Sequence, residues 1–252
     1  MKKIADGNTA EIFEWADNRV CKLWRPNFPT EDVDYEARVS HIIASSQLPV
    51  PKVYDVIEYE GRRGIIYERI TGITLFEWIF ADLSRFEDGA RWLGRLHATI
   101  HQHPALDGLP NQRDRLRRHI THTTHLNASE RAILLTKLDA MLDDSVVCHG
   151  DFHPQNVLVA DEKATIIDWM DATLGSGYAD IARTLLLIDG AEAPPEFLEL
   201  FKSAYLDEYA RHRPLDREMV MRWYPIIAGA RLIEHTSSQE ITRLLGIVRD
   251  SL

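Results

Sequence analysis

Alternating apolar and polar positions in the first seventy residues predict β-strands. The alternation covers four segments: residues 10–16, 19–24, 53–59 and 63–70. Asp17 and Asn18 separate the first two segments, Glu60 and Gly61 separate the last two, and both pairs favour tight turns. Between the two hairpins, apolar residues at helical spacing predict one helix over residues 30–45. This part of the chain therefore has the pattern of a small sheet with one accompanying helix.

Beyond Gly72 the apolar positions change to a helical period. Helices are expected near residues 86–100, 111–125 and 128–142, from 178, from 194, and around 219–230. The segment 146–168 interrupts them with three short β-branched runs separated by turns. We predict an α+β fold: a small, mainly antiparallel sheet lobe over residues 1–70 and a larger, mostly helical lobe over residues 71–252.

Composition and charge narrow the class of protein. Of the 252 residues, 45% are apolar and 27% are charged, which excludes disordered and collagen-like chains. There are 39 acidic and 29 basic residues, and the resulting formal charge of −10 opposes binding to a nucleic acid. The acidity is otherwise typical of a solvated surface.

The two cysteines and the N-terminal residues indicate the cellular compartment of the protein. Cys21 and Cys148 each lie in a short apolar run, so we expect buried thiols and no disulfide framework. The first residues contain no apolar leader, and no apolar run approaches the roughly 18–20 residues that span a bilayer. A cytoplasmic protein without a membrane partner is expected.

The segment 149–156, with the sequence HGDFHPQN, carries the most informative chemistry. Asp151 and Asn156 are separated by four residues in a loop, and Asp168 ends the hairpin strand that returns from Asn156. This order can place two carboxylates and an amide oxygen on one rim, and such hard oxygen ligands suit Mg²⁺ bound to phosphates. Asp151 would then accept a hydroxyl proton. The alternative is a pair of turns capped by these side chains.

The same segment matches, without a gap, the HGDxxxxN catalytic loop of the aminoglycoside phosphotransferase-like small-molecule kinases, which are relatives of the protein kinases. The chain resembles this family, and the resemblance implies a protein-kinase-like bilobal fold. It implies Asp151 as the catalytic base, with Asn156 and Asp168 as ligands of Mg²⁺. It also implies that Asp180 braces the backbone of the catalytic loop.

Two residues far from the catalytic loop extend the resemblance. Lys22 falls where the family has the strand lysine that holds the α and β phosphates of ATP, and Glu36 falls where the family has the partner glutamate on the following helix. Without the catalytic loop, Lys22 would be interpreted as an edge-strand lysine, and Glu36 as one of several acidic residues on a solvated helix.

Further nucleotide contacts are implied at the strand face and at the connection between the lobes. Val20 lies two residues before Lys22, on the same face, and would line the adenine pocket. The segment 67–72 resembles the interlobe hinge of the family. Backbone groups of Glu68 and Ile70 would therefore pair with the adenine edge.

The chain departs from the kinase pattern in two places. Gly7 is the only glycine before Gly61, so there is no GxGxxG loop, and Thr9 with nearby backbone amides is expected to cover the phosphates instead. Only about ten residues follow Asp168 before the next expected helix, which is too short for an activation segment regulated by phosphorylation.

The sequence predicts an ATP-dependent, Mg²⁺-dependent phosphotransferase that moves the γ-phosphoryl group of ATP to a hydroxyl of a small molecule. An aminoglycoside-like antibiotic and a hydroxylated or amino-alcohol metabolite are both candidate acceptors. Residues 105–140 and the helices after Gly190 are expected to bind the acceptor, although they carry no interpretable signature. The alternatives are a catalytically silent nucleotide-binding regulator of the same fold and, less favoured, a protein kinase.

Three other groups of residues have the composition of possible binding sites. Histidines 97, 101 and 103, or 119, 122 and 125, lack the cysteine or carboxylate of a recognisable zinc signature, so surface or packing roles are favoured. Arginines 113, 115, 117 and 118 favour a solvated helix face over an anion site. Glu234 and Glu240 are among the acidic residues that could meet an ammonium group of an acceptor.

Overall fold

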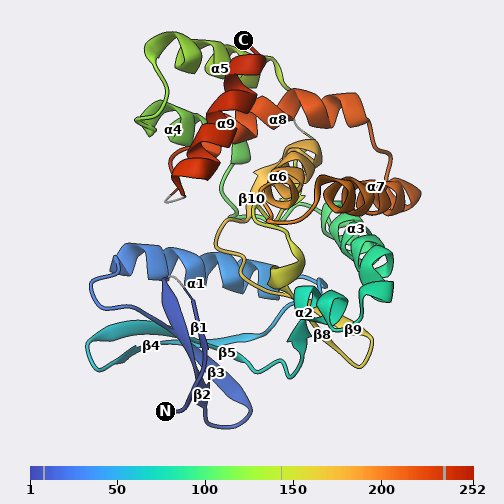
Figure 1. The fold of residues 1–252 in the computed structure, drawn as a ribbon. Coiled ribbons are helices and arrows are strands. Elements are labelled where there is room, and N and C mark those ends of the chain that lie inside the picture. The colour runs from blue at the N-terminus through green and yellow to red at the C-terminus, as the bar shows by residue number, and fades with distance from the viewer. Residues whose placement is uncertain (8, 143, 235–236) are drawn as a thin grey trace. The chain divides into compact units, whose positions relative to one another are not determined.

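A five-stranded antiparallel sheet contains the predicted hairpins (Figure 1). The computed structural model describes residues 1–7, 9–142, 144–234 and 237–252. The strand order is β1-β2-β3-β5-β4. The strands are β1 (Lys3–Asp6), β2 (Ala10–Trp15), β3 (Arg19–Trp24), β4 (Val53–Tyr59) and β5 (Arg62–Glu68). The four predicted strands are therefore confirmed, and β1 is an addition at the edge of the sheet.

Both hairpins turn through residues with positive φ angles. Asp17 and Asn18 each have φ of 56°, and Glu60 and Gly61 have φ of 52° and 73°. Asn, Asp and Gly tolerate this left-handed region at low cost, and consecutive residues there match the twist of two paired strands. The local sequence therefore specifies the register of each hairpin.

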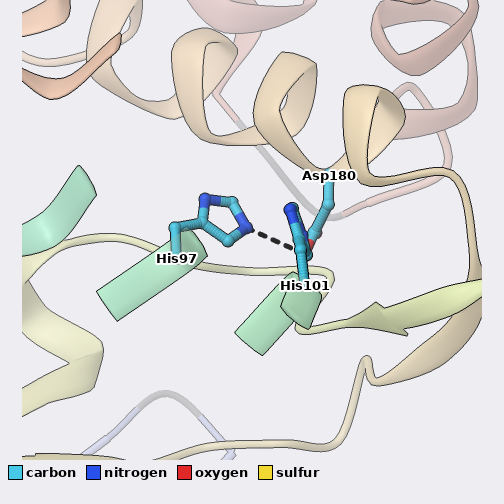
Figure 2. A group of neighbouring side chains, drawn as sticks. All are labelled: His97, His101 and Asp180. Atoms are coloured by element: carbon cyan, nitrogen blue, oxygen red, sulfur yellow. Dashed lines mark hydrogen bonds and ion pairs between the residues drawn. The ribbon is translucent and has the colours of Figure 1, made fainter. Parts of the chain in front are cut away.

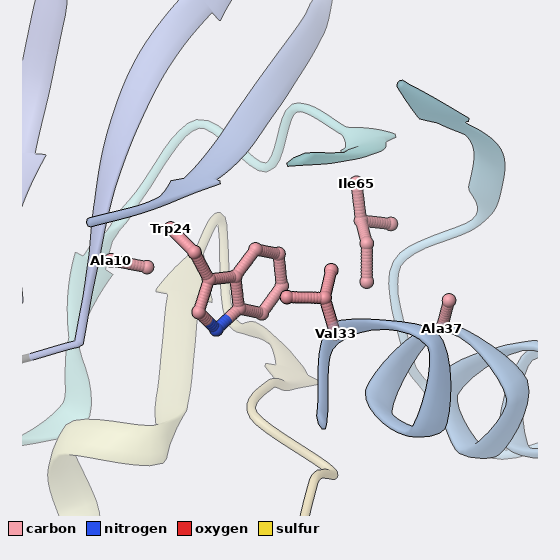
Figure 3. Packing of buried hydrophobic residues seen from close by; sticks show 5 residues of the cluster. All are labelled: Ala10, Trp24, Val33, Ala37 and Ile65. Atoms are coloured by element: carbon pink, nitrogen blue, oxygen red, sulfur yellow. The ribbon is translucent and has the colours of Figure 1, made fainter. Parts of the chain in front are cut away.

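Helix α1 (Thr30–Ala44) covers one face of this sheet and supplies two of the five buried residues of the cluster between them. Its buried side chains meet those of the strands in a cluster of five residues: Ala10, Trp24, Val33, Ala37 and Ile65. Figure 3 shows the Trp24 indole next to Val33, with Ile65 of β5 above Ala37. All five are at most 5% exposed, so the helix is fixed to the sheet mainly by apolar burial.

The chain forms two compact units, neither of which is continuous in sequence. The first unit consists of Met1–Trp78, Leu106–Gly108 and Pro154–Asp171, and the second of Ile79–Ala105, Leu109–His153 and Ala172–Leu252. The expected lobes, residues 1–70 and 71–252, stay a prediction about domain organisation. The catalytic-loop segment 149–156 passes from the second unit into the first between His153 and Pro154.

A second, three-stranded sheet in the first unit contains two of the three predicted β-branched runs, and the first run pairs elsewhere as β7 (Val146–Cys148). Its order is β6-β8-β9, from β6 (Ile73–Thr74), β8 (Val157–Ala160) and β9 (Lys163–Ile166). The 3₁₀-helix η2 (Pro154–Asn156) directly precedes β8, while α2 (Leu75–Phe80) and the 3₁₀-helix η1 (Leu83–Arg85) follow β6. Asn156 and Asp168 thus flank one hairpin, as the sequence predicts.

Seven helices and a two-stranded ladder make up the rest of the described chain. The helices are α3 (Phe86–Gln102), α4 (Gln112–His122), α5 (Ala128–Ala140), α6 (Gly177–Asp189), α7 (Pro195–His212), α8 (Arg217–Arg231) and α9 (Ser238–Asp250). The ladder pairs β7 (Val146–Cys148) with β10 (Thr173–Gly175). Helix α3 approaches α7 so closely that a Cβ on Gly94 would lie 2.3 Å from the Tyr205 carbonyl oxygen.

The protein is therefore a mixed α and β fold with a mainly antiparallel sheet, as predicted. Within the described residues, no helix has both the length and the apolar character that crossing a membrane would require. Cys21 and Cys148 are both buried, as expected from their apolar surroundings.

Candidate active site

Lys22 joins two carboxylates that are distant in sequence. It lies on β3, and its Nζ is 2.7 Å from Oε1 of Glu36 on α1 and 3.0 Å from Oδ1 of Asp168 after β9. The ammonium also lies 5.2 Å from the centre of the Trp24 ring on the same strand face. Strand alternation and the helix stripe thus direct the two predicted partners toward each other.

The charge on Lys22 is stabilised by this environment. Burial alone lowers the pKa of Lys22, but the carboxylates of Asp168 and Glu36 outweigh burial and hold that pKa well above its usual range. The Lys22 side chain is only 16% exposed. A half-buried, permanently protonated lysine is a point charge suited to phosphate oxygens.

Tyr67 at the end of β5 supports Glu36 from the other side. Its hydroxyl donates to Oε1 of Glu36 at 3.2 Å and lies 3.1 Å from the Ser40 hydroxyl on the next turn of α1. Burial raises the pKa of Tyr67, so the hydroxyl stays a neutral donor. Glu36 is 1% exposed, and its Oε2 has no hydrogen-bond partner within the described part of the chain. The carboxylate is thus held at Oε1 by two donors.

Asn156 and Asp168 provide oxygen atoms on two segments joined by a backbone hydrogen bond. The Ile167 amide donates to the Asn156 carbonyl at 2.9 Å, next to Asp168 in sequence. Asn156 is buried, whereas the Asp168 side chain is 48% exposed and its backbone has a positive φ of 64°. A carboxylate and an amide oxygen in adjacent segments are the donor types that Mg²⁺ takes in proteins, so these residues fit that ion.

Asp151, in the second unit, is held by two basic side chains. Arg183 of α6 donates from Nη2 to its Oδ1 at 3.0 Å, and Nε2 of His153 lies 3.4 Å from its Oδ2. Burial raises the pKa of Asp151, but the His153 contact and the Arg183 charge outweigh it and hold that pKa well below its usual range. Asp151 is therefore an ionised, partly exposed hydrogen-bond acceptor.

Asp180 fixes the backbone that carries Asp151. Its Oδ2 accepts the His149 amide at 2.7 Å, and its Oδ1 accepts the Gly150 amide at 2.8 Å. The predicted bracing of the catalytic loop by Asp180 is thus confirmed. Because Asp180 lies in the first turn of α6, its carboxylate also sits at the positive end of the helix dipole.

Two histidines complete the surroundings of Asp180 (Figure 2). His97 and His101 lie one turn apart on α3, and their Nε2 atoms are 3.0 and 3.2 Å from Oδ2 of Asp180. On their other sides, the Nδ1 atoms lie 2.6 and 2.8 Å from the hydroxyls of Tyr205 and Tyr209 on α7. Each imidazole ring is thus held between the Asp180 carboxylate and a tyrosine hydroxyl.

The same three residues have the composition of a metal site, but their atoms are already engaged. The ligand atoms of His97, His101 and Asp180 lie within 4.8 Å of one another, and all three residues are buried. Burial lowers the pKa of His97 to about 4, which keeps its ring neutral in this packed environment. Since the carboxylate serves two backbone amides, we interpret the trio as structural, in agreement with the packing role favoured for His97 and His101.

The remaining implied nucleotide contacts lie on or near the main sheet. Val20 is half-buried on β3 and pairs with Tyr67 of β5. Thr9 is exposed, and its carbonyl accepts the Arg25 amide at 3.0 Å. The Glu68 amide donates to the Lys52 carbonyl at 2.9 Å, and the half-buried Ile70 lies two residues beyond the end of β5. Their roles toward a nucleotide stay predictions.

Sequence patterns did not reveal the contact of Arg183 with Asp151. Arg183 lies one helical turn after Asp180, and this spacing was the available signal. The ion pairs of Arg183 with Glu234, and of Arg231 with Glu234 and Glu240, join residues that no local pattern connects. Consequently, the two glutamates considered for an ammonium group already pair with guanidinium groups.

The arginine-rich face of α4 is at least partly structural. Arg113 donates to the backbone carbonyls of Leu138 and Met141 at the end of α5, and Arg117 pairs with Asp139. These contacts join α4 to α5, a structural role that differs from the solvated helix face expected from the sequence.

Comparison with known proteins identifies related folds. An amicoumacin kinase, hAmiN, in complex with AMP-PNP, Ca²⁺ and Ami is 16% identical, with a TM-score of 0.63 over 99% of this chain and 86% of that chain. An aminoglycoside-3'-phosphotransferase of type VIII is 19% identical, with a TM-score of 0.64 over 91% of each chain. A putative fructosamine-3-kinase from Haemophilus somnus 129PT is 15% identical, with a TM-score of 0.64 over 100% and 90%. These likenesses show a shared fold.

Sequence comparison gives the family. Acyl-CoA dehydrogenase family member 10 of Mus musculus is 27% identical over 182 residues, and the match covers 61% of this chain and only 16% of that protein's length. The model of the phosphotransferase enzyme family (APH) matches residues 1–215, which include every site residue described above except those of the C-terminal ion pairs. The chain therefore belongs to the phosphotransferase enzyme family.

Proposed function

We propose that the protein is an ATP-dependent small-molecule kinase that transfers the γ-phosphoryl group of ATP to a hydroxyl. The observation that carries the proposal is the contact of Lys22 with both Glu36 and Asp168, which are 14 and 146 residues away in sequence. A surface ion pair involves only two residues. A phosphate site requires a fixed cation near a carboxylate that can bind a metal ion, and Lys22 with Glu36 and Asp168 has this composition.

Each residue would have a defined part in the reaction. Lys22 would neutralise ATP phosphate oxygens, Glu36 would hold Lys22 in place, and Asn156 and Asp168 would hold Mg²⁺. When bound, Mg²⁺ supplies charge neutralisation at the phosphates. The amicoumacin kinase with a related fold is in complex with AMP-PNP and Ca²⁺, which supports a nucleotide and a divalent cation as ligands here.

Asp151 would orient the acceptor. Its ionised carboxylate would accept the hydrogen bond of the attacking hydroxyl, receive the proton as the new oxygen–phosphorus bond forms and the bond to ADP breaks, and later release it to solvent. Because the transition state of phosphoryl transfer is loose, positioning and charge neutralisation contribute most of the acceleration. The reaction needs no phosphoenzyme.

The chemical class of acceptor is broader than one antibiotic. The related folds include proteins named for an aminoglycoside, for amicoumacin and for fructosamine, so a hydroxyl on a small polar molecule is the shared feature of the named acceptors. We propose such an acceptor here and assign no nucleic-acid or membrane partner. A cytoplasmic location, where ATP is available, stays part of the proposal.

The experiment that tests this function is an ATP-consumption screen with Mg²⁺ against aminoglycosides, amino alcohols, sugars and other hydroxylated metabolites. Asp151→Asn serves as the blank, and phosphorus NMR or mass spectrometry identifies the product. A phosphorylated acceptor that disappears in the blank supports the kinase. Nucleotide binding without hydrolysis or transfer to any acceptor favours the silent regulator, and transfer to proteins alone favours a protein kinase.

A further inference from the structure

Helix α6 contacts four consecutive residues of the catalytic loop. Asp180 accepts the amides of His149 and Gly150, and the hydroxyl of Thr184 donates to the Phe152 carbonyl at 2.8 Å. Between these two anchors, Arg183 donates to the carboxylate of Asp151. Asp180 and Thr184 therefore hold the backbone of the loop, whereas Arg183 holds the side chain to which we assign the chemistry.

Arg183 is itself fixed from its other end. Its Nη1 donates to Oε1 of Glu234, which lies between α8 and α9, while Oε2 of Glu234 accepts Nε of Arg231 at 3.3 Å. Arg231 in turn donates to Oε1 of Glu240 on α9 at 3.1 Å. The Arg183 side chain is 12% exposed. Because a guanidinium is planar and rigid, fixing Nη1 on Glu234 determines where Nη2 meets Asp151.

This arrangement restricts a side chain that would otherwise rotate. The terminal torsion of an aspartate has a broad energy profile, and a displacement of about 1 Å at a reacting group can cost on the order of 10²-fold in rate. Among the described residues, Arg183 from α6 and His153 from the same loop face Asp151, with Glu234 on the far side of Arg183. The positive charge of Arg183 favours the ionised carboxylate.

We propose that Arg183 is a positioning residue for phosphoryl transfer, and that Glu234, in the segment between α8 and α9, holds Arg183 in the orientation that aims the Asp151 carboxylate at the acceptor hydroxyl. This inference rests on the proposed role of Asp151. It extends the positioning of Asp151 to a segment beyond residues 1–215, which are the residues that the family model matches.

The test compares Arg183→Met, Arg183→Lys and Glu234→Gln with the wild type in the ATP-consumption assay, using an acceptor found in the screen or water alone. Lys202→Met is the matched control, because Lys202 is a similarly buried cation that pairs with Asp189 at the other end of α6. We expect Arg183→Met to lower kcat by about ten- to a hundredfold, the range for a hydrogen bond to a charged group, with little change in KM for ATP. Lys202→Met should retain wild-type kcat.

Three further results separate positioning from a general loss of structure. Arg183→Lys, which keeps the charge, should recover part of kcat. The double variant Arg183→Met with Glu234→Gln should have the same kcat as Arg183→Met alone. Both changes disrupt the same chain of contacts from Glu234 through Arg183 to Asp151. The acid limb of the kcat profile should move to higher pH in Arg183→Met, since the carboxylate loses a neighbouring positive charge.

The inference is overturned if folded Arg183→Met keeps wild-type kcat and an unshifted acid limb, or if the two single changes are fully additive. Urea unfolding of each variant establishes that it is folded. If Arg183→Met is unfolded, Arg183→Lys is compared with the wild type in its place. A wild type without phosphotransferase activity contradicts the proposed function. An active wild type with an equally active Arg183→Met contradicts only the role of Arg183, so the two failures are distinguishable. An unshifted carbon-13 titration of the Asp151 carboxyl in folded Arg183→Met also counts against the inference.

Discussion

The Lys22 cluster of the first unit and the Asp180 cluster of the second unit both contain carboxylates, but the carboxylates have different hydrogen-bond and ion-pair partners. Lys22 meets Asp168, whose side chain is 48% exposed, through an ion pair. Asp180 is 1% exposed and is hydrogen-bonded to two backbone amides and to the rings of His97 and His101. An exposed ion pair can exchange a partner for a ligand, whereas a buried carboxylate bound to backbone cannot do so without disrupting the fold.

The difference separates two tasks within one reaction. The first cluster has the charge and access to receive phosphates and a metal ion. The second has neither free charge nor access, and its effect is to hold the loop that presents Asp151. Changes in the first cluster should therefore appear in nucleotide binding, and changes in the second in stability or in the chemical step.

The largest expected effect belongs to Asp151. Asp151→Asn removes the negative acceptor but keeps the size of the side chain, and we expect turnover to fall by about 10²- to 10⁴-fold, as for the loss of a general base. Steady-state kinetics with a phosphorylated acceptor measures it, and Asp207→Asn on the exposed side of α7 is the control. Turnover within twofold of wild type would remove Asp151 from catalysis.

The Asp180 cluster predicts a stability loss in acid. His97 has a pKa of about 4 when folded and an ordinary value of 6.5, so the unfolded chain binds more protons between these values. Stability should therefore fall as pH drops from 6.5 to 4, by roughly 3 kcal/mol from His97 at 1.36 kcal/mol per pKa unit. His119, whose pKa burial also lowers to about 4, adds to this slope.

Urea unfolding as a function of pH checks this expectation. His97→Gln removes the titrating ring, so its stability should depend less on pH between 6.5 and 4, even if it is lower at neutral pH. The exposed His125→Gln is the control and should keep the wild-type slope. Equal slopes for wild type and His97→Gln would mean that the cluster does not keep His97 neutral.

Lys22 should affect the nucleotide more than the fold. Lys22→Met removes the point charge, and the loss of a charge-assisted hydrogen bond predicts an increase of about ten- to a hundredfold in KM for ATP. A reduction in kcat is also compatible, because the same phosphates carry charge in the transition state. Lys163→Met, an exposed change on β9, should leave both constants unchanged. An unaltered KM and kcat in Lys22→Met would disprove the phosphate site.

Tyr67 should give the smallest effect. Tyr67→Phe keeps the ring but removes the donor to Glu36, and a neutral hydrogen bond of about 1 kcal/mol predicts roughly fivefold weaker nucleotide binding. The measurement is calorimetric titration with AMP-PNP and Mg²⁺, with the exposed Tyr54→Phe as control. If both variants bind like the wild type, Lys22 and Glu36 need no support from β5.

Sequence reasoning succeeded where structure is local or where a motif has a fixed order. The hairpins follow from strand alternation and from turn residues that tolerate positive φ, and Asp168 follows from the loop motif and the hairpin after it. Strand β1 was missed because all four of its residues are exposed, which removes the apolar alternation. The short strands β6 and β10 are defined by pairing with distant segments, which no local pattern encodes.

In the candidate site, too, some residues were predictable from motifs and others were not. Lys22, Glu36 and Asp168 were found through motifs; the contact of Lys22 with Glu36 was expected, whereas its contact with Asp168 was not. The contacts of Tyr67 with Glu36 and of Arg183 with Asp151 depend on how helices pack on strands and loops. Such contacts are set by tertiary structure, so periodicity and spacing could not predict them.

The most direct test of the division between the two clusters is calorimetric titration of AMP-PNP with Mg²⁺ into wild type, Lys22→Met and Asp151→Asn. We predict that Asp151→Asn binds the nucleotide nearly as tightly as wild type while Lys22→Met binds it at least tenfold more weakly. Equal weakening in both variants, or wild-type binding in Lys22→Met, would contradict the assignment of nucleotide binding to the Lys22 cluster and of chemistry to Asp151.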